Sequence, residues 1–451
     1  MNIVIVGCGN VGATLAEHIS NENHRVSVVD KKEKVVENLS DTIDVYGIVG
    51  NGTSLNVLEE AGAKNCDLFI AVMESDEMNL LACLIAKNLG AKTLIARVGN
   101  PEYGNEIASI KESLGLNMII NPHQASAREM ARLLKYPSAL DVDQFVRTKV
   151  ELVSYKLTAD SPLCNLHLKD FGAKYSSNIL IPVIERDDEV IVPGGDFEMQ
   201  EGDIVSVFGP MDETKRFFEK IGIPISSAHN AMIVGGGRTC IYLAKTLVAM
   251  GIDVKIIEKD EVECDRLTEM LGKATVIQGD ATDKALLLEE GIEDVDAFIA
   301  NTNLDEENIM LALYAKKVSK AKVITKVHRT SYDDIIDSLD IGSVIYPKYI
   351  MAERIVKFIR SKNHDEGNNI VSLYQLSDTR VEAIEFKVDE KVPFINKPIS
   401  EVNIKKGIIL GCVNHQGNIS IATGSTVIEP GDTVVIITTK KGVHKLSDIV
   451  K

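Results

Sequence analysis

A tandem repeat is the feature that most constrains the fold of this chain. The run IVIVGCGNVG returns as MIVGGGRTC, so that Gly7 matches Gly235 and Gly9 matches Gly237. The register continues at the pairs Asp30 and Glu258, Gly50 and Gly279, Asp76 and Asp305, Asn79 and Asn308, and Arg97 and Lys326. Chance similarity does not keep register over half a chain, so the sequence predicts two copies of one unit rather than a single large core.

Each copy is expected to have two parts. In the first part, short β-branched runs alternate with helix-like segments, which is typical of a parallel sheet. In the first copy these runs cover residues 3–6, 26–29, 46–49, 68–72 and 93–97. A helix beginning at Pro122 or Pro347 follows, and then strands separated by Gly and Pro turns. The predicted fold class is α/β, a tandem duplication of a Rossmann-like doubly wound domain followed by a small α+β module.

The same pattern sets the expected domain boundaries. The predicted parts are 1–121 (first nucleotide-binding domain), 122–140 (connecting helix), 141–226 (first small module), 227–346 (second nucleotide-binding domain), 347–366 (connecting helix) and 367–451 (second small module). Polar stretches near Ser226 and at 361–369 are interpreted as linkers.

The first glycine-rich turn carries the strongest chemical signal. Gly7, Gly9 and Gly12 form a complete G-x-G-x-x-G between a strand and a helix. The first glycine permits the tight turn, the second lets backbone approach a pyrophosphate, and the third lets the helix pack on the strand. Asp30 ends the next strand, where a carboxylate binds a ribose hydroxyl and repels a 2′-phosphate. This predicts NAD(H) or an adenine nucleotide rather than NADP, the alternative being a turn that serves only the fold.

The second copy departs from this pattern. Gly235, Gly236 and Gly237 keep the turn, but Cys240 replaces the third glycine and should push the helix off the strand. Arg238 adds a cation beside the expected phosphate position. A working second site and a degenerate turn kept for folding both remain open.

Other candidate residues give weaker signals. Arg97 and Lys326 end equivalent strands, where ligands of open α/β sheets bind, although a surface charge is the plainer interpretation. Acidic residues that follow the preceding strand are expected to meet the positive end of a helix, namely Asp76, Glu77, Asp305, Glu306 and Glu307. The nine histidines show no metal-ligand spacing, and no acid–base pair suited to catalysis is apparent.

Charge and cysteine content narrow the class further. A net charge of −17 disfavours nucleic acid and anionic lipid as partners, while helix N-termini still allow local anion sites. Seven scattered cysteines without C-x-x-C spacing predict reduced thiols. No secretory signal and no apolar run of about 18 residues is apparent. Work at a membrane would therefore require an embedded partner.

The helices after Pro122 and Pro347 carry apolar stripes. The second stripe contains Met351, Ile355, Phe358 and Ile359, and the weaker first one contains Met130, Leu133 and Leu134. Each helix either covers its own sheet or crosses to a neighbouring domain, joining halves or subunits.

Together, the domain order, the paired fingerprints and the GNGT and GDAT turns at Gly50 and Gly279 resemble the TrkA family, the cytosolic regulatory subunits of Trk potassium-uptake systems. The resemblance spans essentially the whole chain. It implies tandem RCK (KTN) domains that bind NAD(H), with ATP or ADP as alternatives. It also implies a homo-oligomeric ring, a dimer or tetramer, beneath a potassium-conducting membrane subunit. The location implied is cytoplasmic, peripheral at the inner face of the membrane through that partner.

The resemblance also implies the binding residues. In the first copy they are Gly7, Cys8, Gly9, Asn10, Val11, Gly12, Asp30, Thr53, Val72, Met73 and Arg97. In the second copy they are Gly235, Gly236, Gly237, Arg238, Thr239 and Glu258. No catalytic or metal-binding residue is predicted. The favoured function is a non-enzymatic gating subunit and the alternative an NAD-dependent oxidoreductase, with the physiological nucleotide and the direction of gating left open.

Overall fold

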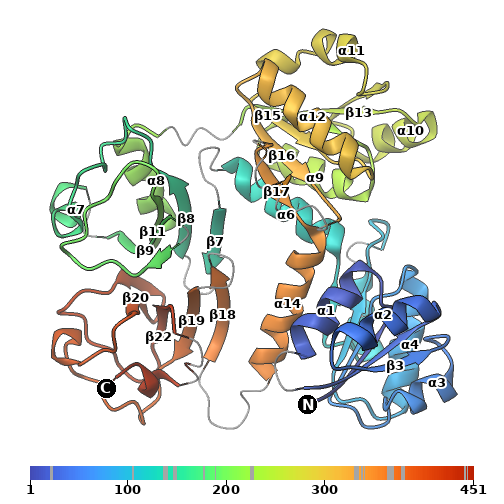
Figure 1. Ribbon diagram of the computed structural model, residues 1–451, viewed down its shortest axis with the longest axis horizontal. Helices are drawn as coiled ribbons and strands as arrows, with labels where there is room; N and C mark the ends of the chain where they lie inside the picture. The colour runs from blue at the N-terminus through green and yellow to red at the C-terminus, as the bar shows by residue number, and fades with distance from the viewer. Residues whose placement is uncertain are drawn as a thin grey trace. The chain divides into compact units, whose positions relative to one another are not determined.

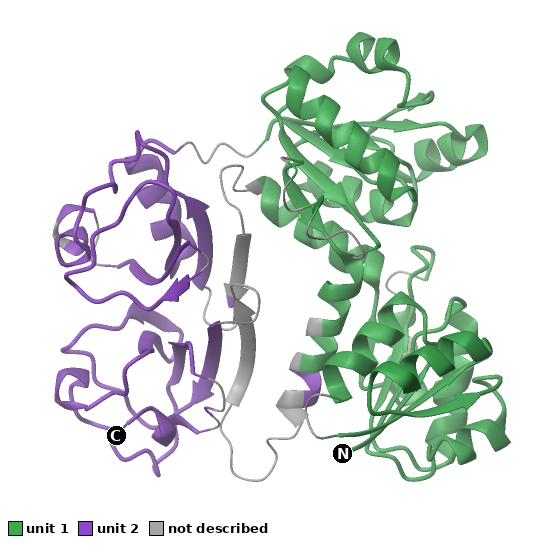
Figure 2. Ribbon diagram, viewed as in Figure 1, with its two compact units in different colours: residues 1–134, 228–356 green, residues 135–227, 357–451 purple. Residues whose placement is uncertain are grey.

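The computed structural model describes residues 1–450 except 21–23, 104–105, 136–140, 146–149, 176–177, 188, 224–227, 330–334, 337–338, 340, 363–369, 377–380, 441–442 and 444. The chain divides into two compact units, one of residues 1–134 with 228–356 and one of residues 135–227 with 357–451 (Figure 2). Each unit therefore combines equivalent parts of both repeats. Residues 224–227, around the linker predicted near Ser226, and residues 363–369 of the second predicted linker lie outside the described residues.

The first lobe of unit 1 is a doubly wound domain. Its strands are β1 (Asn2–Val6), β2 (Arg25–Asp30), β3 (Tyr46–Val49), β4 (Leu68–Ala71), β5 (Leu94–Arg97) and β6 (Met118–Ile120). They form a parallel sheet in the order β3-β2-β1-β4-β5-β6. The helices are α1 (Asn10–Ser20), α2 (Glu33–Thr42), α3 (Leu55–Glu60), α4 (Asp76–Asn88) and α5 (Glu106–Leu114). The β-branched run of β1 is buried on both faces because helices cover both sides of such a sheet.

The second lobe repeats this plan (Figure 1). Its strands are β12 (Asn230–Val234), β13 (Asp253–Glu258), β14 (Thr275–Gln278), β15 (Ala297–Ala300), β16 (Lys322–Lys326) and β17 (Ser343–Ile345). They pair in the order β14-β13-β12-β15-β16-β17. The helical segments are α9 (Arg238–Ala249), α10 (Glu261–Met270), α11 (Lys284–Glu289), the 3-10 turn η1 (Ile292–Asp294) and α12 (Asp305–Val318). In both lobes the order reverses beside the first strand, which is where open α/β sheets bind ligands.

Helices α6 (Pro122–Lys135) and α14 (Pro347–Lys362) settle the two interpretations of the apolar stripes. Met130, Leu133 and Leu134 of α6 are buried in the core of the second lobe, so this helix crosses from one lobe to the other. On α14, Tyr349 meets the His18 ring of α1, with ring centroids 6.5 Å apart. The stripe of α14 is buried within a single chain, since Ile355 is 0% exposed and Ile359 is 1% exposed. The helices therefore join the two halves of one chain, and the stripe does not supply a surface between subunits.

Unit 2 holds two five-stranded antiparallel modules with the same strand order. The first contains β7 (Asp141–Phe145), β8 (Val150–Lys156), α7 (Leu168–Lys174), β9 (Leu180–Arg186), β10 (Glu189–Ile191), β11 (Ile204–Pro210) and α8 (Met211–Lys220). The second contains β18 (Ile370–Leu376), β19 (Val381–Lys387), η2 (Ile399–Glu401), β20 (Ile408–His415), β21 (Asn418–Ile421), β22 (Thr433–Thr438) and η3 (Leu446–Ile449). A shared core that includes Phe208 and Val435 joins the modules. The α/β tandem duplication predicted from sequence is thus confirmed.

Candidate functional site

The first glycine-rich turn is shaped by close backbone contact. Gly7 has φ +94°, and a Cβ placed there would lie 2.7 Å from the Met73 amide nitrogen. Only glycine combines this conformation with so close a neighbour. At Gly9, by contrast, an added Cβ would meet no atom within 4 Å. The turn is therefore tight on the side facing β4 and open on the side where a ligand would approach.

Asp30, at the end of β2, holds this turn in place. Its Oδ2 accepts a hydrogen bond from the Cys8 amide at 2.7 Å, and its Oδ1 accepts one from the Lys32 amide at 2.9 Å. Carboxylate oxygens have further lone pairs, so both atoms can accept another donor. Asp30 thus orients the turn and can still bind a hydroxyl group.

A cavity of about 900 Å³ opens beside this turn. Nine of the residues predicted for the first copy line it, namely Gly7, Cys8, Gly9, Asn10, Val11, Asp30, Val72, Met73 and Arg97. Gly12 and Thr53 do not line this cavity. The Thr53 amide and hydroxyl instead donate to Asn51 Oδ1 at 3.1 and 2.9 Å. The volume lies within the range of small-molecule sites, about 300–1,000 Å³.

The second lobe forms part of the same cavity wall. Thr239, Lys326, His328, Pro347 and Lys348 line it together with the first-lobe residues. Both lobes belong to unit 1, and α6 brings His123 between them. His123 Nδ1 lies 3.0 Å from Thr239 Oγ1 on α9. The cavity is thus a feature of the pair of lobes rather than of the first lobe alone.

The cavity carries an excess of positive charge. Its lining includes the cations Lys31, Lys32, Arg97, Lys326 and Lys348, against the carboxylates Asp30 and Glu74. Burial, and then the charges of Arg97 and Lys326, lower the pKa of His123 to about 3, so its ring is neutral. The buried Nε of Arg97 has no hydrogen-bond partner among the described residues. A chain of net charge −17 therefore concentrates cations at one place, which suits an anionic ligand.

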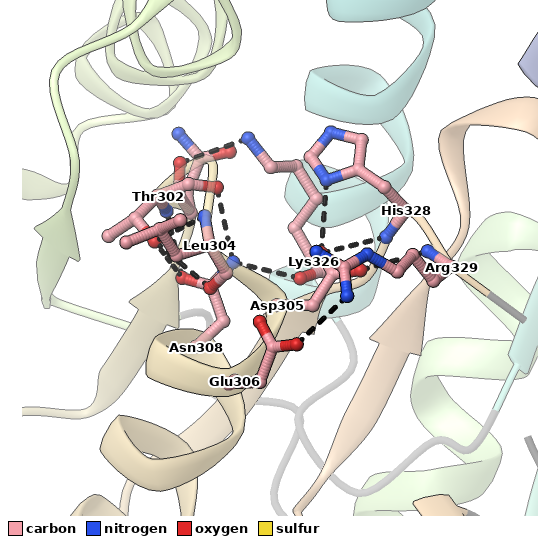
Figure 3. Close-up of polar contacts among 9 residues, drawn as sticks. Thr302, Leu304, Asp305, Glu306, Asn308, Lys326, His328 and Arg329 are labelled. Atoms are coloured by element: carbon pink, nitrogen blue, oxygen red, sulfur yellow. Dashed lines mark hydrogen bonds and ion pairs between the residues drawn. The ribbon is translucent and has the colours of Figure 1, made fainter. Parts of the chain in front are cut away.

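A polar network fixes the end of the second lobe's crevice (Figure 3). Asn308 donates to the carbonyl oxygens of Thr302 at 3.1 Å and Lys326 at 2.9 Å. Lys326 Nζ donates to the carbonyl of Asn301 at 3.0 Å. Burial lowers the pKa of Lys326 to about 8. In the first lobe Asn79 makes the matching bonds, to Met73 at 3.1 Å and Arg97 at 3.0 Å. The repeat thus preserves the framework that positions each basic residue.

The acids at the starts of α4 and α12 do more than face the helix dipole. Asp76 accepts hydrogen bonds from the Gly99 and Asn100 amides at 3.0 and 2.8 Å. Asp305 accepts from the amides of His328 and Arg329 at 3.0 and 2.8 Å (Figure 3). Both aspartates therefore tie the helix start to the loop after the fifth strand. The expectation of a helix-terminal role alone missed this cross-link, because it depends on tertiary contact.

The second glycine-rich turn keeps the backbone geometry of the first. Glu258 Oε2 accepts from the Gly236 amide at 2.6 Å, matching Asp30 in the first lobe. Gly235 has φ +96°, and an added Cβ at Gly237 would meet no atom within 4 Å. Over Gly236, however, Leu267 Cδ1 lies only 2.5 Å from the position of an added Cβ. The equivalent position of the first turn is Cys8, whose side chain is buried, so the leucine of α10 fills the place of a side chain and leaves the open face at Gly237 free.

Arg238 does not simply lie beside the second turn. Its NH1 is 3.9 Å from the position of an added Cβ at Gly99, a residue of the first lobe. Of the residues predicted for the second site, Thr239 lines the cavity shared by the lobes, whereas Gly235, Gly236, Gly237, Arg238 and Glu258 do not. Thr239 and Arg238 of the second copy therefore lie next to residues of the first lobe.

Sequence reasoning missed several lining residues. The cavity is also lined by His123, Lys31, Lys32 and Lys348, none of which is among the binding residues that the sequence predicts. His123 and Lys348 each follow the proline that begins a crossing helix. Their position at the start of a helix could have indicated a site for an anion. It points to this cavity only once α6 and α14 are known to connect the two lobes.

Fold and site together define the class of protein. It is a chain with two Rossmann-type lobes, each followed by a small antiparallel module, and with a cationic cavity that the two lobes share. Among the residues that the structure describes, none forms a helix long and apolar enough to cross a bilayer.

Comparison with known proteins identifies the family. The TrkA-N domain model matches residues 3–122 and 231–347, and the TrkA-C domain model matches residues 152–222 and 383–451. The chain belongs to the TrkA family, a family of non-enzymatic regulatory proteins of potassium uptake. It is 31% identical to the Trk system potassium uptake protein TrkA homolog 1 of Methanosarcina mazei, over 97% of each chain. It is 30% identical to the Trk system potassium uptake protein TrkA of Haemophilus influenzae, over 100% of this chain and 98% of the relative.

Solved structures support the same fold. The GsuK channel bound to NAD matches with a TM-score of 0.63 at 17% identity, covering 98% of this chain and 77% of that one. GsuK bound to ADP matches with a TM-score of 0.51 at 17% identity, covering 80% of this chain and 69% of that one. The predicted tandem RCK architecture is therefore confirmed at the level of the fold.

Proposed function

We propose that this protein is a nucleotide-sensing gating subunit that controls a potassium-conducting membrane partner. The observation that carries the proposal is the cationic cavity at the first glycine-rich turn, walled by both lobes. The Trk names of the relatives and the NAD and ADP held by GsuK support the same ligand class and system. Binding without turnover distinguishes this function from the oxidoreductase alternative.

The residues present fit an NAD(H) or adenine nucleotide in the first lobe. The open face at Gly9, with the helix start at Asn10 and Val11, would receive the pyrophosphate. Asp30 would accept hydrogen bonds from a ribose, and Arg97 would offer its unpaired Nε to phosphate. The bound nucleotide would supply negative charge to the cavity, and the protein would supply fixed donors around it.

The shared wall suggests how binding is read out. A ligand that touches the turn of the first lobe and also Lys326 or Lys348 favours the arrangement of the lobes in which both contacts exist. A ligand shifts an equilibrium only through such differential contacts. The nucleotide would therefore act on the relation between the two lobes, which α6 and α14 already connect.

The second glycine-rich turn is proposed as a weaker site. Cys240 replaces the third glycine, so its side chain occupies space that the fingerprint normally leaves for the close approach of helix and strand. Of the residues predicted for this site, only Thr239 lines the shared cavity. We therefore assign most nucleotide affinity to the first lobe, with Gly235 to Thr239 and Glu258 contributing less.

Assembly is the remaining part of the proposal. The protein would form a homo-oligomeric ring, a dimer or tetramer, held at the inner face of the membrane by its potassium-conducting partner. Light scattering of the purified chain and co-purification with that partner test this directly. A monodisperse monomer, with and without nucleotide, would contradict the ring.

The binding test compares equivalent acids in the two lobes. Asp30→Asn keeps an acceptor but removes the charge, and we expect it to weaken NADH or ATP binding by about 1–3 kcal/mol. Glu258→Gln is the matched control and should have a smaller effect. Isothermal calorimetry measures both, and absorbance at the NADH band with candidate carbonyl substrates detects turnover. Equal loss in the two variants would contradict the assignment to the first lobe, and catalytic NADH consumption would favour the oxidoreductase.

A further inference from the structure

The two small modules keep the same aspartate at the same turn. Asp203 precedes β11 and Asp432 precedes β22, and they are 1% and 2% exposed. Each accepts a hydrogen bond at 2.8 Å from the amide three residues earlier, Gln200 in one module and Glu429 in the other. A buried carboxylate needs a compensating partner, so the residue that faces it matters for stability.

In the first module that partner is Arg186, the last residue of β9. Its Nε donates to Asp203 Oδ1 at 2.7 Å, and a terminal nitrogen donates to Oδ2 at 2.8 Å. The guanidinium also lies over the Phe197 ring, 4.7 Å from the centroid. Arginine stays charged at every physiological pH, so this pairing is permanent.

In the second module the equivalent partner is His415, the last residue of β20. Its Nδ1 lies 2.6 Å from Asp432 Oδ1 and 3.9 Å from a carboxylate oxygen of Glu429. Both carboxylates belong to the turn before β22, and strands β20 and β21 carry no Asp, Glu, Lys or Arg. The His415 side chain is 47% exposed, so protons exchange with it freely. The repeat has therefore kept the buried acid and exchanged a permanent cation for a titratable one.

We propose that His415 and Asp432 form a proton-sensitive clasp that makes the second small module, and not the first, respond to pH. The clasp joins the end of the β20–β21 hairpin to the turn that leads into β22. Histidine changes charge between about pH 5 and 8. As an imidazolium it compensates the buried carboxylate with a charge-assisted hydrogen bond, and as a neutral ring it offers only an ordinary one.

The sign of the effect follows from the charges. An imidazolium facing Asp432 gives the charge-assisted form of the clasp and a neutral ring the ordinary form, and histidine side chains in general pass from the first to the second between about pH 5 and 8. The Arg186 clasp keeps its charge over this range. Alkaline conditions should therefore loosen the 429–432 turn while the 200–203 turn stays closed. The inference does not depend on nucleotide binding.

Hydrogen exchange of the full-length protein tests the clasp. Amide protection is measured at pH 6 and pH 8.5 over residues 427–433 and 198–204, each corrected for the intrinsic exchange rate at that pH. We expect protection of the second segment relative to the first to fall by about threefold to fivefold at pH 8.5. The first segment is thus an internal reference within the same molecule.

Exchanging the partners between modules provides matched controls. His415→Arg should make protection of residues 427–433 independent of pH, and Arg186→His should transfer the pH dependence to residues 198–204. His415→Gln, which donates but never carries charge, should show the weaker protection at both pH values. If the ratio of protection between residues 427–433 and 198–204 is the same at pH 6 and pH 8.5 in the parent protein, the proposal is wrong. A pH dependence that persists in His415→Gln would overturn it as well.

Discussion

Replacing Gly12 by alanine probes how closely the first helix must approach the glycine-rich turn. A Cβ added at Gly12 would lie 1.9 Å from the Gly7 carbonyl oxygen and 3.2 Å from a methyl group of Val72. An ordinary contact between carbon and a carbonyl oxygen is about 3.3 Å, so α1 would have to move by about 1.4 Å. The obstacle is backbone and cannot rotate away. The displacement must therefore be shared between the helix and the turn.

Two opposing terms set the size of the effect. Forcing an extra carbon into a packed contact costs about 1–3 kcal/mol, whereas alanine gains up to about 1 kcal/mol over glycine in a helix. We expect a net loss of about 1–2 kcal/mol in the free energy of unfolding. Nucleotide affinity should also fall, by about tenfold or more, which corresponds to at least about 1.4 kcal/mol, because the displaced turn misplaces its amide donors.

Cys240 provides the control, because it occupies the equivalent position in the second lobe and is fully buried there. That lobe already accommodates a Cβ, so Cys240→Ala removes one sulfur atom without altering the approach of α9. Chemical denaturation and calorimetry are measured for both variants. If Gly12→Ala binds nucleotide as tightly as the parent and unfolds at the same denaturant concentration, the packing argument is wrong. A similar loss of binding in Cys240→Ala would also refute it.

Two further predictions concern buried side chains of unit 1. Burial places the pKa of Lys326 near 8, below its value of about 10.4 in an unfolded chain, so folding releases a proton between these values and stability rises with pH. The Lys326→Met variant should therefore have a free energy of unfolding about 1–3 kcal/mol higher than that of the parent protein at pH 7. Chemical denaturation at pH 9.5 should show a smaller difference between the two proteins. The same difference at both pH values would contradict this prediction. Ile355→Ala should cost about 2–5 kcal/mol by leaving a cavity beneath α14. Light scattering should show that Ile355→Ala leaves the size of the oligomer unchanged. A smaller oligomer with unchanged stability would instead indicate that α14 lies at an interface between subunits.

Local signals explain how much of the architecture could be predicted from sequence. A β-branched strand followed by Gly7 and Gly9, with Asp30 ending the next strand, encodes the turn within about thirty residues, so no tertiary information was needed. Because the second half repeats the pattern of the first, the same fold could be predicted for it. The confirmed fold class rests on these short-range patterns.

Properties that depend on contact between distant segments could not be predicted in the same way. The crossing of α6 places His123 against Thr239, a contact that neither helix encodes alone. Leu267 packs over Gly236, where the first turn carries the side chain of Cys8, and its own spacing is that of an ordinary core residue. Asp76 looked like a helix-terminal acid because its partners at Gly99 and Asn100 lie beyond the next strand. In each case the sequence specified the residue but not its neighbour.

Equivalent positions of the two repeats differ in whether their basic side chains can lose their charge near neutral pH. The first half places Arg97 in the cavity and Arg186 against Asp203, and both residues keep their charge at any physiological pH. The second half places Lys326 and His415 at those positions. Burial brings the pKa of Lys326 to about 8, and histidine is the side chain that titrates nearest neutrality. The second half therefore carries titratable side chains at two positions where the first half carries permanently charged ones. The same argument predicts that Lys326→Arg removes the pH dependence of stability that this residue contributes, as His415→Arg removes that of the 429–432 turn.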